Sequence, residues 1–479
     1  MKAIAAVRSK WKHVLALAVL IAGAVGVSGW RQESFEQALE GKAKVRASGF
    51  VSAQVVASSP YAPAFVGAAA PGTDFTPQVE MGFHDNNEWE PAIAADRFNH
   101  VYIIYPQYGG VPGCPSCYSP TIIFQMSSDG GKSWTSPSVI YPEGSNAYQV
   151  DAQIVVDPVD GKTVYAAWLQ NNKSDILVGK STDYGATWSF VLADHTNAGT
   201  DKPILAVRGQ DVYVSYNHAQ TAYVTSSRDG GATFTEVKMN HNAKLGWSLG
   251  SGGTVTPNGN VYFSWEGYEN NGGAKGPVNL YVSSSTDGGA TWATQTIDVS
   301  AAPPDCSSMS CGWAFLGAAM TMTSDASGNL YLLWNAGSTA GGAERMYFSA
   351  SINGGSRWSP KQDVSTAPVG TEHAFPAIAA GGNGDVRIAW MDARAASGGI
   401  DRWNVYYRRS TDGGNTWSAE SDLSTYVPTY PSYIFTDGFR FPFGDYFEMD
   451  IDQAGTTHAV WGEGYDYDSP GSIWYSQGK

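Results

Sequence analysis

Acidic side chains recur at one kind of position in this chain, just before short segments of small and apolar residues. The residues concerned are Glu90, Asp151, Asp201, Glu372 and Asp445. Carboxyl groups held at a defined separation can perform general acid and base chemistry when one of them keeps its proton. We therefore treat all five as candidate catalytic residues. The competing interpretation is that an acidic residue at this position caps or fixes an adjacent loop.

A second group of polar and aromatic residues is predicted to lie at the same end of the strands. These candidates for ligand binding are Glu266, Trp313, His373, Asp392, Arg394, Arg440 and Glu463. A surface rich in carboxylates, with aromatic side chains nearby, suits a polyhydroxylated ligand or a cation. No cofactor is evident from the sequence, and Ca²⁺ is the candidate for a bound cation.

Other common chemistries lack support in the sequence. The residues His84, His100, His241 and His373 do not have the spacing of metal ligands. No HExxH motif, phosphate loop, dinucleotide fingerprint or Ser-His-Asp signature occurs. The candidate carboxylates therefore remain the strongest chemical signal.

A repeated eight-residue motif organises the chain. Five segments match Ser-x-Asp-x-Gly-x-(Ser/Thr)-(Trp/Phe), at 127–134, 181–188, 227–234, 285–292 and 410–417. A sixth copy, at 351–358, has Asn353 in place of the Asp and Arg357 in place of the hydroxyl residue. Asp or Asn accepts hydrogen bonds from turn amides, Gly adopts positive φ, and the aromatic residue packs on neighbouring strands. The motif is thus predicted to build turns rather than to perform catalysis.

Strand-like segments surround each copy of the motif in the same order, three before it and one after it. This arrangement predicts four-stranded antiparallel blades in an all-β propeller. The C-terminal segments at 446–451, 458–461 and 473–476 form a last unit without the motif. Residues 76–82 have the length and pattern to complete it as a fourth strand, which would remove the open sheet edge. Seven blades follow from this count, with six as the alternative.

The motif is the Asp-box of the sialidase-like (BNR) propeller superfamily, which the chain resembles over residues 76–479. The resemblance implies the propeller fold, with the boxes at the end opposite the functional site. Sialidases clamp their substrate with three arginines, the first usually in an (F/Y)RIP motif, and no such motif occurs here. Only Arg394 and Arg440 occupy positions where an arginine at the mouth would be expected. An exo-sialidase is therefore the least favoured of the functions considered.

Three functions are consistent with the sequence. The first is binding of a carbohydrate at the mouth of the central channel, with hydrolysis or another cleavage of it left open. The second is a non-catalytic propeller that binds or assembles with a protein partner, and the third is an exo-sialidase. The carbohydrate function predicts carboxylates and aromatic residues around one pocket. The interaction function predicts a filled channel and an exposed apolar patch.

The N-terminal residues predict export. Basic residues within 1–12 precede an uncharged, mostly apolar run at 14–27, which indicates a signal peptide or a short membrane anchor over 1–29. Loss of residues 1–29, which hold four basic and no acidic residues, would change the net charge from −15 to −19. Such a surface repels nucleic acid and suits a secreted, periplasmic or cell-surface protein, with a membrane contact only through an uncleaved anchor. Residues 30–75 are expected to form a linker with a short helix around 33–44, ahead of the propeller at 76–479.

The four cysteines form two closely spaced pairs, Cys114 with Cys117 and Cys306 with Cys311. An even number of cysteines in an exported chain favours two local disulfides. A four-cysteine zinc site and free thiols are the alternatives.

Overall fold

The computed structural model describes residues 44–47, 51–54, 60–68, 73–141, 148–196, 200–218, 221–239, 247–270, 275–304, 317–395, 402–427, 430, 434–435, 438–439, 441–464 and 471–479. The chain divides into the units Met1–Lys44 and Val45–Lys479, and nearly all described residues belong to the second. Within the described residues no helix is long and apolar enough to span a bilayer.

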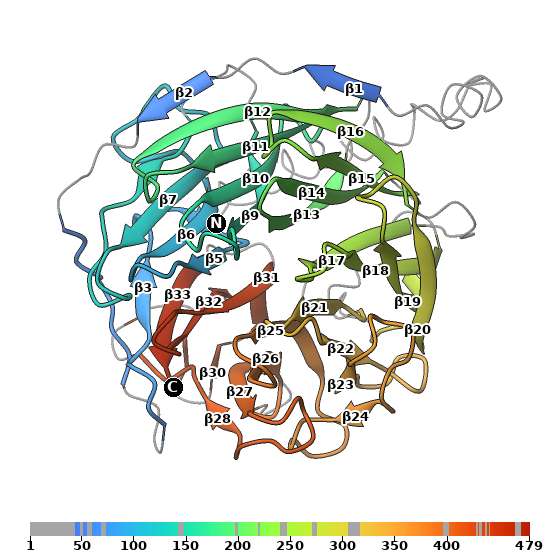
Figure 1. The fold of residues 1–479 in the computed structure, drawn as a ribbon. Coiled ribbons are helices and arrows are strands. Elements are labelled where there is room, and N and C mark those ends of the chain that lie inside the picture. Colours follow the sequence, from blue (N-terminus) through green and yellow to red (C-terminus); the bar gives the residue numbers. More distant parts are fainter. Residues whose placement is uncertain are drawn as a thin grey trace, which may run out of the picture. The chain divides into compact units, whose positions relative to one another are not determined.

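Seven antiparallel sheets surround a central axis in the second unit (Figure 1). Blade 1 contains β5 (Ala92–Ala95), β6 (Val101–Tyr108), β7 (Thr121–Ser127) and β8 (Ser138–Val139), and β4 (Asn87–Glu88) also pairs with β6. Blade 2 contains β9 (Val150–Val156), β10 (Val164–Gln170), β11 (Asp175–Ser181) and β12 (Thr187–His195). Blade 3 contains β13 (Asp201–Arg208), β14 (Asp211–His218), β15 (Thr221–Ser227) and β16 (Thr233–Lys238). Blade 4 contains β17 (Trp247–Val255), β18 (Val261–Asn270), β19 (Lys275–Ser285) and β20 (Ala293–Ser300).

The remaining blades follow the same order. Blade 5 contains β21 (Met320–Ser324), β22 (Leu330–Ala336), β23 (Arg345–Ser351) and β24 (Gln362–Asp363). Blade 6 contains β25 (His373–Ala380), β26 (Val386–Asp392), β27 (Asn404–Ser410) and β28 (Ser421–Asp422). Blade 7 contains β31 (Phe441–Ile451), β32 (Thr457–Gly464), β33 (Gly471–Gly478) and β3 (Val79–Met81). The short strands β29 (Ile434–Phe435) and β30 (Gly438–Phe439) pair with each other.

The ring closes through a strand from near the start of the described chain. Strand β3 pairs with β33, with Val79 opposite Tyr475. The inner strands β5, β9, β13, β17, β21, β25 and β31 each contact the next around the ring, including β31 with β5. The predicted seven blades of four antiparallel strands and the closing N-terminal strand are therefore confirmed.

Two further strands lie within residues 30–75, for which a linker was expected. Strand β2 (Val51–Gln54) pairs antiparallel with β12, and β1 (Lys44–Ala47) lies next to β16 in the sheet order. Each extends its sheet to five strands. The helix expected around 33–44 falls outside the described residues, apart from Lys44 at the start of β1.

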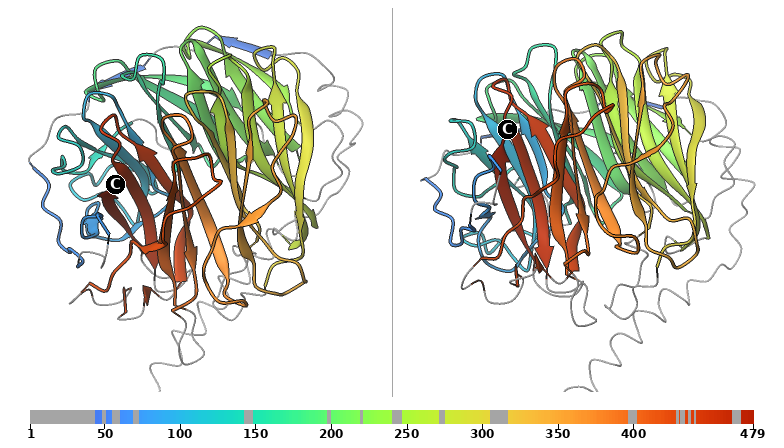
Figure 2. Two further views of the ribbon diagram at one scale, coloured as in Figure 1. Left: turned by 60° about the horizontal axis from the view of Figure 1, so that its bottom comes forward. Right: turned by 90° about the horizontal axis from the view of Figure 1, so that it is seen from below.

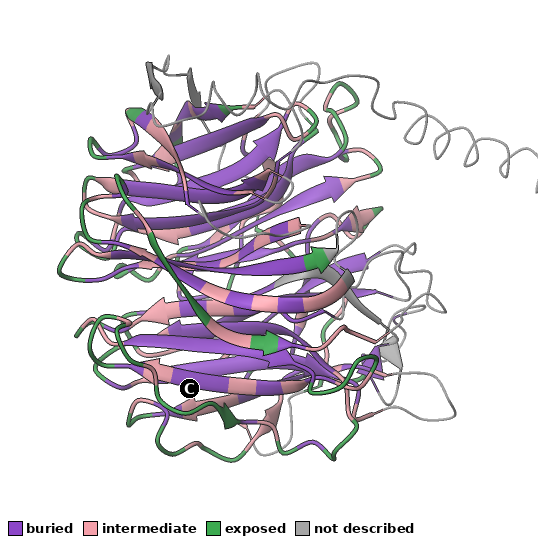
Figure 3. Cartoon of the chain, turned by 90° about the vertical axis from the view of Figure 1, so that its right-hand side faces the viewer, coloured by how far each residue is buried: buried purple, intermediate pink, exposed green. Residues whose placement is uncertain are grey.

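The strands are buried because each blade is covered on both faces by its neighbours. The second strands show this most clearly, since every residue of β10 and of β22 is buried. The sequences of strands buried on both faces are continuous apolar runs, without an alternation of apolar and polar residues. The strands of neighbouring blades run beside one another through the thickness of the ring (Figure 2), and exposed residues lie mainly in the turns (Figure 3).

The Asp-box turns have the predicted hydrogen bonds. In the first box, Ser127 Oγ donates to Asp129 Oδ1 (2.8 Å), and Gly131 N donates to Ser127 Oγ (2.8 Å). Ser133 donates to Asp129 through its amide (2.9 Å) and its hydroxyl (2.6 Å). The degenerate box at 351–358 keeps the bond from Arg357 N to Asn353 Oδ1 (3.0 Å). The box residues thus organise turns, as their chemistry predicted.

The boxes also join neighbouring blades. A Cβ added to Gly131 of blade 1 would lie 1.9 Å from the Tyr475 hydroxyl of blade 7. A Cβ added to Gly414 of blade 6 would lie 2.1 Å from the Phe348 ring of blade 5. The last glycine of these boxes therefore provides the space into which an aromatic residue of the preceding blade fits.

Candidate functional site

A cavity of about 410 Å³ lies on the axis at one end of the ring. Residues at the start of several inner strands line it, together with residues at the ends of second strands such as Tyr108 and Glu266. The Asp-box turns join third and fourth strands at the opposite end. The cavity therefore occupies the channel mouth to which the candidate residues were assigned.

Four charged residues from blades 1 to 3 form one cluster in this cavity. Lys173 Nζ lies 2.7 Å from Asp201 Oδ1 and 3.7 Å from Asp151 Oδ2. The amide of Asp151 donates to Glu90 Oε2 (3.1 Å). Burial alone would lower the pKa of Lys173, but the carboxylates of Asp151 and Asp201 raise it well above its usual value. Lys173 is therefore held as a cation between two aspartates.

The backbone at the starts of the inner strands is strained. Glu90, Asp151, Lys202 and Phe375 have φ values of 50°, 57°, 51° and 52°. Strand pairing is irregular at the same level, with register shifts in the inner hairpins of blades 2, 3 and 6. A left-handed non-glycine residue costs about 1–3 kcal/mol, and such residues concentrate at functional sites. All four strained residues line the cavity.

Glu266 is a buried carboxyl at the cavity wall. Its Oε1 accepts hydrogen bonds from the Ser251 hydroxyl and from Met320 N (2.6 Å). Burial raises the pKa of Glu266 to about 7, although these donors and the positive charge of Lys202 act to lower it. Glu266 therefore keeps its proton up to about neutral pH, as a general acid must.

A second buried carboxyl, Glu448 of β31, lies deeper along the axis. It accepts hydrogen bonds from Gln153 Nε2 (2.5 Å) and from Ile93 N (3.2 Å). Burial raises the pKa of Glu448 to about 8. Both Gln153 and Glu448 also line a second cavity of about 650 Å³, which extends toward the box end. The two cavities therefore meet at this level of the channel.

Aromatic side chains form much of the remaining wall. Trp89 and Tyr108 pack together with their ring centroids 4.9 Å apart and their planes at 33°. Tyr148, Tyr268 and Phe375 line the cavity with them. The site therefore combines aromatic surfaces with carboxylates, an arrangement that can bind the apolar faces and the hydroxyl groups of a sugar.

Residues 75–303 match the family model described as a BNR repeat-like domain. The resemblance to sialidase-like BNR propellers is thereby confirmed. No curated protein matches the chain significantly.

Solved structures similar to this chain share little sequence with it. A protein of unknown function from Dyadobacter fermentans has 12% identity and a TM-score of 0.46, covering 85% of this chain and 99% of that chain. A PL25 polysaccharide lyase, an ulvan lyase, has 10% identity and a TM-score of 0.48, covering 82% and 95%. A Trypanosoma rangeli sialidase has 11% identity and a TM-score of 0.40, covering 90% and 60%. Identities this low, with TM-scores below 0.5, assign no function to this chain.

The structure brings four of the candidate residues to the cavity. They are Glu90, Asp151, Asp201 and Glu266. The catalytic or binding role of each stays a prediction. Trp313 and Arg440 lie outside the described residues, and Asp445 belongs to β31 without a described side chain.

Three other candidates belong to blade 6 and are not among the described residues that line the cavity. His373 Nδ1 lies 2.9 Å from the carbonyl oxygens of Glu344 and Thr371, and burial lowers the pKa of His373. Arg394 pairs with Asp392 and Glu420. Through these partners His373 joins blade 6 to Glu344 of blade 5, and Arg394 joins Asp392 to Glu420 within blade 6.

The last two candidates also lie apart from the cavity. Glu372 accepts hydrogen bonds from the amide of Glu344 (3.2 Å to each oxygen). Glu463 is buried and accepts hydrogen bonds from Trp461 Nε1 (2.8 Å) and Gln78 Nε2 (3.3 Å). Burial raises the pKa of Glu463 to about 8. Neither residue is among the described residues that line the cavity, and the role of each stays a prediction.

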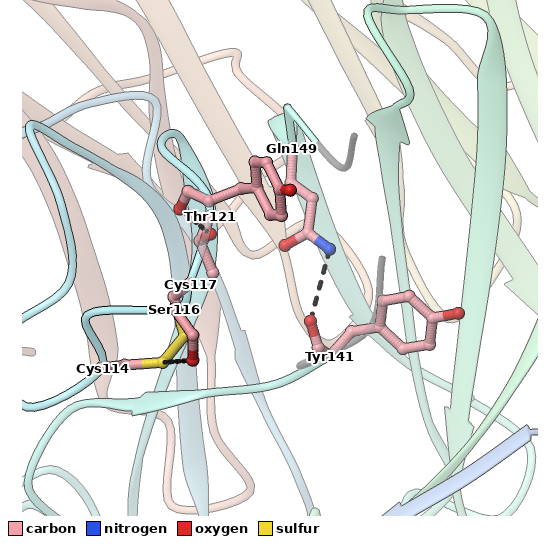
Figure 4. Close-up of a disulfide and its surroundings, with 7 residues drawn as sticks. Cys114, Ser116, Cys117, Thr121, Tyr141 and Gln149 are labelled. Atoms are coloured by element: carbon pink, nitrogen blue, oxygen red, sulfur yellow. Dashed lines mark hydrogen bonds between the residues drawn. A yellow bond between two sulfur atoms is a disulfide. The ribbon is translucent and has the colours of Figure 1, made fainter. Parts of the chain in front are cut away.

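One predicted disulfide is present, between Cys114 and Cys117 in the loop after β6 (Figure 4). Within this loop, Gly109 N, next to the cavity residue Tyr108, donates to Ser119 Oγ (2.8 Å). Gln149, also drawn in Figure 4, fixes the start of β9 by accepting a hydrogen bond from Ile122 N (2.9 Å). The pair Cys306 and Cys311 lies outside the described residues.

Sequence reasoning missed several residues that line the cavity, chiefly Lys173, Ser251, Glu448 and Tyr148. Lys173 lies three residues after the end of β10, and distance along the chain from a strand end does not show where a loop side chain lies. Glu448 lies within β31, three residues after the candidate Asp445. The described residues contain no group of three or more His, Cys, Asp or Glu side chains arranged to hold a metal ion. The Ca²⁺ expectation stays a prediction.

Proposed function

We propose that this protein binds a carbohydrate in the cavity at the channel mouth. The observation that supports this most strongly is the convergence of the Glu90–Asp151–Asp201 carboxylates and the Trp89–Tyr108 aromatic pair on one cavity. A cavity of about 410 Å³ is within the size range of small-molecule sites, roughly 300–1,000 Å³. Carboxylates accept hydrogen bonds from sugar hydroxyls, while aromatic rings cover the C–H faces of a sugar ring.

The alternative of a protein-interaction propeller has less support. That function predicts a filled channel and a continuous apolar patch on the surface. The large exposed hydrophobic residues among those described come from separate blades and turns, for example Tyr118, Val299, Ile352 and Val369. The channel mouth, by contrast, contains a cavity.

We further propose that the protein acts outside the cytoplasm, as its N-terminal sequence predicts. Glycans are abundant substrates at the cell surface and in secretions. The Cys114–Cys117 disulfide is the kind of bond that persists in an oxidising compartment.

Cleavage of the bound glycan is a second candidate function, favoured by Glu266. Its proton could be donated to the glycosidic oxygen as the bond to the anomeric carbon breaks. Water would add its hydroxyl to that carbon and give its proton to a carboxylate of the Lys173 cluster. Glycoside hydrolysis requires these two roles, a carboxylic acid that donates a proton to the leaving oxygen and a carboxylate that accepts a proton from water.

The binding proposal is tested on a broad glycan array, followed by titration calorimetry of each hit. We expect a defined glycan to bind the wild type, and Asp151→Asn to weaken that binding at least about tenfold, since one hydrogen-bonding carboxylate is lost. Asp211→Asn is the matched control. It also removes an ion-paired aspartate, but its partner Arg228 (3.0 Å) lies at the box end.

Two results would contradict the proposal. One is the absence of any glycan hit from protein that is shown to be folded. The other is equal loss of affinity in both variants. Turnover of neutral aryl glycosides by the wild type, lost in Glu266→Gln, would establish cleavage as well.

A further inference from the structure

The charged side chains around the cavity restrict which glycans it can accept. Three carboxylates, Glu90, Asp151 and Asp201, line it from three successive blades. Among the described lining residues, two cationic side chains accompany them, Lys173 and Lys202. Acidic groups therefore outnumber basic ones even before Glu266 and Glu448 are included.

Lys173 has little capacity left for an anionic ligand. Its ammonium group already faces Asp201 at 2.7 Å and Asp151 at 3.7 Å. Its side chain is 34% exposed, so a ligand can approach it, but only beside these two aspartates. A carboxylate of the ligand would meet two like charges within a few ångströms of the one cation.

Lys202, the second cation, is largely buried. It is 9% exposed and lies at the start of β13, next to the wall formed by blade 4. Its positive charge acts on the carboxyl of Glu266 and opposes the rise in the pKa of that group. Lys202 is thus less open to a ligand than Lys173, whose side chain is 34% exposed.

No arginine side chain occurs among the described residues that line the cavity. Guanidinium groups are the side chains that best match carboxylate and sulfate groups, because they donate two parallel hydrogen bonds. Arg394, a candidate for this role, lies over the ring of Tyr406 at 3.6 Å and pairs with Asp392 and Glu420. It does not line the cavity.

We infer that the cavity selects neutral or amine-bearing glycans and rejects glycans that present a carboxylate or sulfate group. The inference rests on the proposed carbohydrate function. Hydroxyl and ammonium groups donate hydrogen bonds, and the Glu90–Asp151–Asp201 carboxylates accept them. An acidic group would instead bring like charges together in a partly buried site, where electrostatic repulsion is only weakly screened.

The test compares glycans that differ in one charged group. Galactose and galacturonate oligomers of equal length and linkage form one pair, and chitin and chitosan oligomers form the other. Titrations at about 0.15 M salt limit long-range effects of the protein's net charge to roughly 8 Å. We expect the uronate oligomer to bind at least about tenfold more weakly than its neutral counterpart, and the amine-bearing oligomer at least as well as the acetylated one.

The variant Asp201→Asn separates the local arrangement from the net charge of the chain. It removes the nearest partner of Lys173, so affinity for the uronate oligomer should rise about tenfold relative to the neutral oligomer. Asp211→Asn changes the net charge equally at the box end and should leave this ratio unchanged. Glu90→Gln, which removes another cavity carboxylate, replaces Asp201→Asn if that variant does not fold.

The possible outcomes distinguish the two proposals. Neutral or amine-bearing oligomers that bind in preference to the uronate, with a ratio that responds to Asp201→Asn alone, support the inference. A uronate or sulfated oligomer that binds the wild type as well as its neutral counterpart overturns it and leaves the carbohydrate function standing. Folded protein that binds no oligomer of any class overturns both.

Discussion

At the scale of single residues, the cavity is notable for carboxyl groups that do not behave alike. Asp151 and Asp201 surround the Lys173 ammonium, whereas Glu266 and Glu448 are buried with raised pKa values. Environment rather than residue type makes this division, since a buried carboxyl loses hydration and an ion-paired one gains a partner. Sites that pair acids and bases are built from such contrasts.

The raised pKa of Glu266 predicts a pH effect on stability. Its folded value of about 7 exceeds the usual 4.5, so the folded protein holds this proton more tightly than the unfolded chain. The stability that this tighter binding of the proton gives to the folded protein is complete below pH 4.5, and it is lost as the pH rises through 7. Glu266→Gln should therefore have little effect at pH 5 and be more stable than the wild type at pH 8 by about 2–3 kcal/mol.

Urea unfolding of the wild type and of Glu266→Gln at the two pH values measures this difference. Ser251→Ala supplies a paired check, because it removes a hydrogen bond that lowers the pKa of Glu266. In that variant the loss of stability should move to higher pH. A Glu266→Gln protein whose stability falls as steeply as that of the wild type would contradict this account of the carboxyl.

At the scale of elements, the Asp-box couples a turn to the contact between two blades. The prediction concerns Gly131, which has a φ of +80° and faces the Tyr475 hydroxyl of blade 7. Gly131→Ala should destabilise the protein by about 2 kcal/mol or more, from backbone strain plus the clash with Tyr475. Gly259 has a φ of +87° with nothing within 4 Å of an added Cβ.

Gly259→Ala therefore measures the backbone strain without a clash, and it should lower the free energy of unfolding by only about 1 kcal/mol. Urea unfolding of both variants gives the comparison. Equal destabilisation by the two substitutions would show that contact between blades 7 and 1 adds nothing at this glycine.

The elements were largely predictable from the sequence, because each blade repeats one local pattern. Six boxes fix the positions of six hairpins, and the segments between them have strand composition. The segment 76–82 could be assigned to the last blade because the C-terminal unit lacks one strand. A second turn motif was missed, in which Asp96 and Asp325 at the ends of inner strands accept hydrogen bonds from amides two and four residues on.

The site was less predictable than the elements that surround it. Glu90, Asp151 and Asp201 could be assigned to the channel mouth from strand order alone. The position of Lys173 depends on the residues 171–173, all of which have positive φ. Arg394 forms ion pairs with Asp392 and Glu420, which lie in two different segments of the chain. These ion pairs could not be deduced from the spacing of residues along the sequence. Contacts of this kind depend on tertiary structure.

At the scale of the whole molecule, buried carboxyls predict an acid-shifted optimum of stability. Burial raises the pKa of a set of carboxyls spread over five of the seven blades: Glu88, Glu266, Glu344, Asp422, Glu448, Asp450 and Glu463. Each of these groups contributes stability that is present at low pH and is lost as the pH rises through the pKa of that group in the folded protein. For Asp422, Glu448 and Asp450 this pKa lies between about 6 and 8.

The box aspartates act in the opposite direction. Hydrogen bonds from Thr291 and Ser285 lower the pKa of Asp287 to about 2, so its contribution is lost as the pH falls from 3.8 toward 2. Unfolding free energies measured from pH 3 to 9 should therefore reach a maximum near pH 4–5 and decline by several kcal/mol toward pH 9. A maximum above pH 7 would contradict the assignment of these groups as buried acids.

The central claim is that the channel mouth is a glycan site, and a crystal structure of the protein with its best-binding array glycan tests it most directly. We predict a sugar ring in the cavity of about 410 Å³, packed on Trp89 and hydrogen-bonded to Asp151 or Asp201. A glycan bound at the Asp-box turns or on the outer face of a blade, with the cavity unoccupied, would contradict the claim.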